Sequence, residues 1–215
     1  QLYISIWNVN LNINSRESVI PLILEEKYSP LTDVAQTNHI LLDDYTTMLV
    51  FNGNDKVSDI KSLISEYDSS SITDYYGNTL ISFLSLDFAD AKGYLLIEEL
   101  SEVCQKKIYR ITQKNIIKNA APIYLSICET AQMIEKIFPT RKFIGYDTLH
   151  FAMNCIRLQN NGSSDLSYYQ SLLSPLAAEK SDDLLLTLQT YLFDADSSVK
   201  ETAEKLYLHR NTVKY

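Results

Sequence analysis

A change in hydrophobic periodicity near residue 115 most constrains what this chain can fold into. Before that point, short runs with the alternation typical of strands are interleaved with segments that have helical spacing. Beyond it the strand patterning fades, and almost every segment has the spacing of an amphipathic helix. The order is roughly β-α-β-β-α-β-α and then helices only. This order predicts an α+β fold, with a mixed sheet covered by helices followed by an all-α region.

The first part of the chain supplies all the clear strand patterns. Its predicted strands are 2–10, 39–44, 46–53 and 79–88, and its predicted helices are 15–28, 57–67 and 94–111. The runs 39–44 and 46–53 meet around Asp43, Asp44 and Tyr45, where a hairpin is predicted.

The second part is predicted to be helical. Its expected helices are 123–138, 148–158, 166–177 and 181–193, with a short strand or connector at 142–147 and a break at Ser174-Pro175. We place the domain boundary near residues 140–147. The chain is therefore expected to contain a sensor-like α/β domain at 1–145 and a helical domain at 146–215.

Composition excludes several classes of function. Three separated cysteines form no CxxC pair, three histidines show no HxxxH or HExxH spacing, and five glycines include no phosphate-binding loop. We therefore expect a cytoplasmic protein with reduced thiols, without cofactor, metal or enzymatic activity. No apolar run is long enough to span a membrane, and 2–10 alternates like a strand rather than a signal peptide. The chain lacks an initiator Met, and we expect its natural ends to lie beyond those given.

The charge distribution singles out the end of the chain. The net charge of −8 argues against nonspecific nucleic-acid binding by the whole surface. Between Ser198 and Tyr215, however, the sequence has four Lys or Arg residues and two Glu residues, which gives a local charge of +2. The last segment therefore has the opposite sign to the rest of the protein.

The closing segment has the pattern of a helix-turn-helix. Ser198 and Glu201 fit a capping box, in which the serine hydroxyl accepts from the Glu201 amide and the glutamate side chain reaches back. Val199, Thr202, Ala203 and Leu206 then share one helical face. A tight connection follows, and a second helix is predicted from His209 or Arg210, with Val213 facing the core.

The polar residues of this segment suit a recognition helix. Arg210 and Asn211 are predicted to contact base edges, because Arg pairs with guanine and Asn with adenine in the major groove. Thr212 and Lys214 are predicted to bind phosphates, and Lys200 the DNA backbone from the first helix. The complete predicted set is Lys200, Thr202, His209, Arg210, Asn211, Thr212 and Lys214. Spacing alone leaves open a helical hairpin that binds no DNA.

Residues 182–215, "DDLLLTLQTYLFDADSSVKETAEKLYLHRNTVKY", resemble the C-terminal helix-turn-helix of the PucR family of bacterial transcriptional regulators, which includes the CdaR-type sugar-diacid regulators. The shared pattern is "LLxTLxxYL", a polar turn, and "ETAxxLxxHRNTVxYRL". Two departures stand out. In the family the recognition helix continues beyond the position of Tyr215 with an Arg-Leu pair and further basic residues, which the given sequence lacks, so its recognition helix is truncated. Ser197-Ser198 replaces the usual small or Asn residue before the motif. The resemblance implies a transcriptional regulator whose partner is double-stranded DNA.

The resemblance also implies a function for the residues that precede the helix-turn-helix. Family members often carry a sensor region before the motif, sometimes a cyclase-like domain related to the GGDEF fold; here no GGDEF sequence occurs. A small-molecule effector and a homodimer are the corresponding expectations, with the leucine-rich helix at 184–192 either a dimer contact or packed inside its own domain. The alternative is an interaction or sensor protein whose helix-turn-helix is degenerate and binds no DNA.

Overall fold

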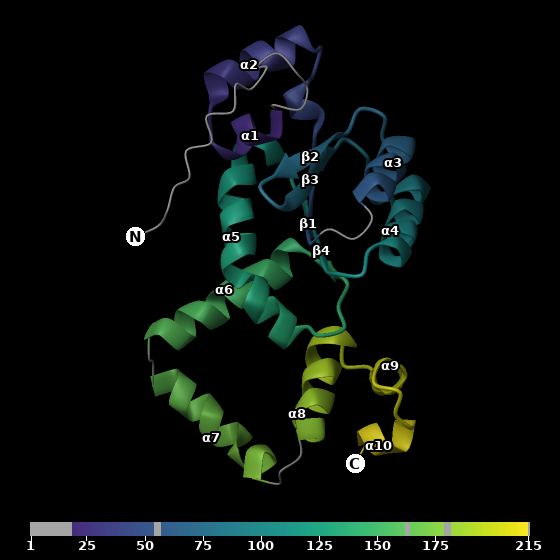
Figure 1. Ribbon diagram of the computed structural model, residues 1–215. Helices are drawn as coiled ribbons and strands as arrows, with labels where there is room; N and C mark the ends of the chain where they lie inside the picture. The colour runs from purple at the N-terminus through teal and green to yellow at the C-terminus, as the bar shows by residue number, and fades with distance from the viewer. Residues whose placement is uncertain (1–18, 54–56, 162–163, 179–181, 215) are drawn as a thin grey trace. The chain divides into compact units, whose positions relative to one another are not determined.

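The computed structural model describes residues 19–53, 57–161, 164–178 and 182–214 (Figure 1). Sheet and helices are both present, and the predicted α+β class is confirmed. The strand predicted at 2–10 lies outside the described residues. Backbone contacts divide the chain into two compact units, 1–124 and 125–215. The domain boundary predicted from sequence, between 145 and 146, stays a prediction.

The first unit contains a βαββαβ core. Its elements are β1 (Thr47–Asn52), α3 (Val57–Tyr67), β2 (Ile72–Tyr76), β3 (Thr79–Leu84), α4 (Ala91–Val103) and β4 (Ile108–Thr112). Within this unit the strand order is β2-β3-β1-β4, and β1 pairs antiparallel with both β3 and β4. This arrangement is the split βαβ of ferredoxin-like domains.

The core of this unit is apolar on both faces of the central strands. All residues of β1 from Thr47 to Phe51 are buried, as are those of β3 from Leu80 to Leu84. Helices α3 and α4 lie next to each other on one side of the sheet, and α1 (Val19–Leu24) lies on the other (Figure 1). Because both faces are covered, β1 and β3 read as continuous apolar runs rather than as alternating ones.

Two predictions before β1 were wrong. The single helix predicted at 15–28 is replaced by α1 and a second helix, α2 (Tyr28–Thr37), separated at Glu26, whose φ is 55°. The run 39–44 is not a strand: His39 has a φ of 54°, and Leu42–Asp44 form the 3-10 turn η2. The predicted hairpin is therefore absent, and β1 takes its partners from the distant strands β3 and β4.

Two further segments differ from prediction. Strand β2 was not predicted; it joins β3 through a two-residue turn in which Gly77 has a φ of 60°. The helix predicted at 94–111 corresponds to α4, which ends at Val103, and the residues from Ile108 onward form β4. The helix predicted at 57–67 is confirmed as α3.

The second unit is helical, as predicted. Its elements are the end of α5 (Ile116–Ile137), β5 (Phe143–Ile144), α6 (Tyr146–Asn161), α7 (Ser164–Ala178), α8 (Asp182–Gln189), the π-helical turn η3 (Thr190–Asp194), α9 (Val199–Lys205) and α10 (Arg210–Lys214). The predicted break at Ser174-Pro175 was wrong, because α7 runs through it. Among the described residues, no helix has the length and apolar character needed to cross a bilayer.

Candidate nucleic-acid interface

Helix α9 begins with the predicted serine cap. The Ser198 hydroxyl accepts a hydrogen bond from the Glu201 amide at 3.2 Å. The reciprocal half of the predicted capping box is replaced, because the Ser198 amide donates to the Ala195 carbonyl at 2.7 Å. The preceding turn includes Asp196 and Ser197, both with positive φ. The cap thus fixes where α9 starts relative to η3.

Helix α9 ends in a Schellman motif. The Leu208 amide donates to the Ala203 carbonyl at 2.8 Å, and the Tyr207 amide donates to the Glu204 carbonyl at 3.3 Å. Tyr207 occupies the left-handed position, with a φ of 55°, where glycine is usual. Its side chain is 97% exposed. This turn sets the direction in which the chain enters α10.

Helix α10 starts at Arg210, one of the two predicted positions. The His209 ring nitrogen Nδ1 accepts from the Asn211 amide at 3.3 Å, and the His209 carbonyl accepts from the Thr212 amide at 2.9 Å. His209 therefore caps the start of α10. Its neighbours Arg210, Asn211 and Thr212 are exposed around that first turn.

The inner sides of α9 and α10 face α8 across an open hollow. An apolar hollow of about 440 Å³ lies between α8, α9 and α10, lined by Leu184, Thr187, Leu188, Tyr191, Val199, Val213 and Lys214. Val213 is half-buried and faces this hollow, in agreement with its predicted inward orientation. The leucine-rich helix α8 thus uses part of its apolar face inside its own unit.

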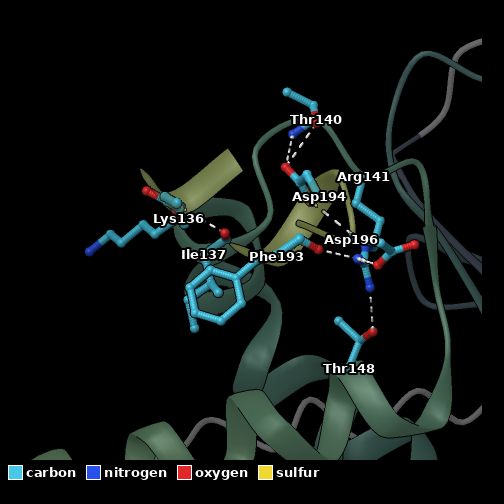
Figure 2. Close-up of polar contacts among 9 residues, drawn as sticks. Lys136, Ile137, Thr140, Arg141, Thr148, Phe193, Asp194 and Asp196 are labelled. Atoms are coloured by element: carbon cyan, nitrogen blue, oxygen red, sulfur yellow. Dashed lines mark hydrogen bonds and ion pairs between the residues drawn. The ribbon is translucent and has the colours of Figure 1, made fainter. Parts of the chain in front are cut away.

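An arginine–aspartate pair ties η3 to the connection between α5 and β5 (Figure 2). The Asp194 side chain is fully buried, and its Oδ2 accepts from the Thr140 amide at 3.0 Å and from the Thr140 hydroxyl at 2.8 Å. The Arg141 Nε lies 3.6 Å from Asp194 Oδ1. Arg141 also donates to the Phe193 carbonyl and, at 3.3 Å, to the Thr148 hydroxyl.

Two neighbouring contacts strengthen the same junction. The Gln189 amide group donates to the carbonyls of Lys136 and Ile137 at the end of α5, with 2.7 Å to Ile137. The rings of Phe138, Phe151 and Phe193 pack together, with centroids 5.4 to 6.1 Å apart. The helix-turn-helix is therefore attached to a scaffold of polar and aromatic contacts.

Comparison with known proteins agrees with the geometry. Residues 184–215, which include most of α8 and all of α9 and α10, match the model of the PucR C-terminal helix-turn-helix domain. These residues form a PucR-type helix-turn-helix domain. The family resemblance stated from the sequence is thereby confirmed.

The whole chain also resembles a solved structure. It aligns with the Regulator of Polyketide Synthase Expression from Bifidobacterium adolescentis at a TM-score of 0.50 and 13% identity, over 93% of this chain and 80% of that one. At such low identity, the likeness extends to the fold alone. No curated protein matched the chain.

The PucR-type domain presents most of the predicted contact residues to solvent. Lys200, His209, Arg210, Asn211, Thr212 and Lys214 are exposed. Thr202 is fully buried, and its hydroxyl donates to the Ser198 carbonyl at 2.7 Å. Thr202 therefore has a structural role in α9, and we leave it out of the contacts proposed below. Lys200 lies 3.8 Å from Glu204 in an exposed i,i+4 pair.

The scaffold residues were not anticipated from the sequence. Arg141 and Asp194 are 53 positions apart, and Arg141 lies outside the family pattern. Asp194 falls in the polar turn of that pattern, but nothing in the sequence pairs it with Arg141. The cap, turn and exposed residues of the helix-turn-helix were thus predicted, whereas the contacts that attach it to the α5–β5 connection were not.

Proposed function

We propose that this protein is a bacterial transcriptional regulator that binds double-stranded DNA through α9 and α10. The proposal is carried by one observation: in a PucR-type helix-turn-helix, Arg210, Asn211, Thr212 and Lys214 are all exposed on the short helix α10. A tightly capped turn precedes them, so the start of α10 is held in a defined orientation.

The roles follow from side-chain chemistry. Arg210 and Asn211 lie on the first turn of α10, the part of a recognition helix that enters the major groove, and we assign them to base edges. Thr212 and Lys214 are assigned to phosphates, and His209 to the groove edge beside its capping role. Lys200 exchanges its weak, exposed partner Glu204 for a phosphate on binding.

Two further features complete the proposal. The regulator acts in the cytoplasm as a homodimer, because two half-sites multiply affinity and specificity. A small-molecule effector bound in the N-terminal region controls it, in line with the sensor regions that precede this motif in resembling proteins. The competing proposal is an interaction protein that binds no DNA, and the chain's net charge of −8 favours it.

The test titrates the full natural protein against its own upstream DNA and a scrambled duplex, by fluorescence anisotropy at several salt concentrations. Lys214→Ala should weaken binding to both duplexes and reduce the salt slope by about 1. Asn211→Ala should cost about 1–3 kcal/mol on the cognate duplex and little on the scrambled one.

Lys118→Ala is the matched control, since Lys118 is an exposed lysine on α5 and its replacement changes the net charge equally. It should leave the salt slope unchanged. If all three variants bind like the wild type, the proposed docking of α10 is wrong. If the folded protein binds neither duplex, with or without cell metabolites, the interaction protein is the better description.

A further inference from the structure

Helix α7 carries an apolar surface that no other described residue of its unit covers. Residues 167–174 are all exposed. Four of them are large and apolar: Tyr168 is 60% exposed, Tyr169 55%, Leu172 57% and Leu173 45%. A helix of this length, with several Ser residues and a Pro, is marginal in water without a packing partner.

The apolar residues of α7 share one face. At about 100° per residue, Tyr168, Tyr169, Leu172 and Leu173 span an arc of roughly 140°. The other side carries small polar residues, and the hydroxyls of Ser171 and Ser174 donate to carbonyls of their own helix at 2.7 and 2.8 Å. The helix is thus amphipathic, and two hydroxyls on its polar side are hydrogen-bonded within the helix.

The charge of α7 restricts what can cover this face. Its fifteen residues, SDLSYYQSLLSPLAA, include one charged residue, Asp165, and no Lys or Arg. DNA and anionic membrane surfaces are both disfavoured, because each is recognised through basic side chains. A second copy of the chain needs no basic side chains and favours a neutral contact surface. Two molecules with a net charge of −8 repel each other least where the contact surface is neutral.

The exposed apolar area supplies most of what a small dimer contact needs. The four side chains together expose roughly 400 Å², given 150–250 Å² for a large side chain. A patch of this size is at the level that marks an interaction site on a monomer. Two copies bury about 800 Å² through these side chains alone, roughly two thirds of the ~1,200 Å² of the smallest specific interfaces. The serines and backbone between them extend the contact.

We propose that α7 is a self-association surface, on which two copies pair antiparallel about a two-fold axis passing near Gln170 and Ser171. In this arrangement Tyr168 of one copy faces Leu173 of the other, and Tyr169 faces Leu172. An antiparallel pair of identical helices satisfies the isologous symmetry of dimers. The contact lies directly before α8, so each dimer carries two PucR-type domains (Figure 1).

This assignment gives a location to the homodimer of the proposed function, but its test uses no DNA. Sedimentation velocity of the full natural protein over a concentration series should show a monomer–dimer equilibrium. Leu172→Lys should weaken the dimer by roughly a hundredfold or more, because symmetry removes the apolar contact twice. Leu41→Lys is the control: Leu41 is 69% exposed and lies in the first unit, so its substitution should leave the equilibrium unchanged.

A mixing experiment tests the antiparallel register. Tyr169→Glu alone should also be monomeric, whereas an equimolar mixture of Tyr169→Glu and Leu172→Lys should recover a heterodimer, because opposite charges then face each other. Circular dichroism verifies that each variant stays folded. A wild type that is monomeric at its highest soluble concentration overturns the proposal. So does a dimer that Leu172→Lys and Leu41→Lys affect equally, or a mixture that stays monomeric.

Because the experiment measures self-association, a failure of the α7 proposal can be distinguished from a failure of the DNA-binding proposal. A protein that binds DNA as a monomer would refute the α7 surface and leave the regulator standing. A dimer lost in Leu172→Lys but inert toward DNA would do the reverse.

Discussion

The buried carboxylate of Asp194 offers a sharp test of how the helix-turn-helix is held. Substitution Asp194→Asn keeps the shape of the side chain and removes its charge. In the wild type Oδ2 accepts two hydrogen bonds from Thr140, and Oδ1 lies 3.6 Å from the Arg141 Nε. In the variant the side-chain NH₂ group must face either Thr140 or Arg141. Because an NH₂ group donates hydrogen bonds and cannot accept them, the contacts on that side are lost.

The magnitude follows from these contacts. Hydrogen bonds to a charged group contribute about 1.5–3 kcal/mol each, compared with about 1 kcal/mol for neutral ones. Weakening the two hydrogen bonds from Thr140 and losing the attraction to Arg141 should lower the free energy of local opening by about 3 kcal/mol. Since 1.4 kcal/mol corresponds to a factor of ten, local opening of η3 and α9 should become roughly a hundredfold more frequent.

Hydrogen exchange followed by mass spectrometry measures this opening directly. Peptides covering 190–206 should lose protection in Asp194→Asn, while peptides covering β1 and β3 keep theirs. Asp196→Asn is the control, because Asp196 is 93% exposed and lies 3.9 Å from Arg141. If both variants exchange alike, or if β1 and β3 lose protection equally, the Arg141–Asp194 contact does not hold the domain locally and the reasoning fails.

Two other predictions concern stability. Burial raises the pKa of Asp68, but hydrogen bonds from Ser70 and Ser85 outweigh it and hold this pKa below its usual value. The resulting stabilisation is present above the unfolded-state pKa of about 4 and is lost as pH falls through the folded-state pKa. Urea unfolding should therefore show Asp68→Asn less stable than the wild type by about 2–4 kcal/mol at pH 7, with the gap closing below about pH 4; a gap independent of pH would contradict this. Tyr207→Gly should raise the thermal midpoint of the helix-turn-helix, with a gain of about 0.5–1 kcal/mol, because glycine adopts the left-handed φ of 55° without strain; a lowered midpoint would show that the exposed ring contributes contacts.

The helix-turn-helix was predictable because its signals are local. The Ser198 cap, the turn and the start of α10 at Arg210 each depend on residues within a few positions of one another. A cap or turn residue acts on its neighbouring amides, so a single sequence is enough to locate it. The helices α3 and α8 were found for the same reason, because their apolar spacing is read within one segment.

The sheet was less predictable because its pairing is not local. Residues 39–44 are apolar enough for a strand, yet the positive φ of His39 and the pairing of β1 with β3 and β4 exclude the predicted hairpin. The Tyr-rich strand β2 lacks a clear alternation, and only its partner β3 identifies it. The contacts of Arg141 with Phe193 and Asp194 span 52 and 53 positions, a separation at which sequence patterns carry no information about proximity.

The π-helical turn η3 has a consequence for how this protein can change over generations. Its Ala195 amide donates to the Thr190 carbonyl, five positions back, so the turn holds one residue more than an α-helix would. A π turn completes about the same rotation as an α turn but uses one residue more, so a single deletion there would leave an α-helical turn that ends in nearly the same direction. The turn that follows lacks this tolerance, because Asp196 and Ser197 hold left-handed φ values and Ser198 caps α9. The extra residue of η3 therefore marks where this domain can gain or lose a residue while α9 and α10 keep their orientation.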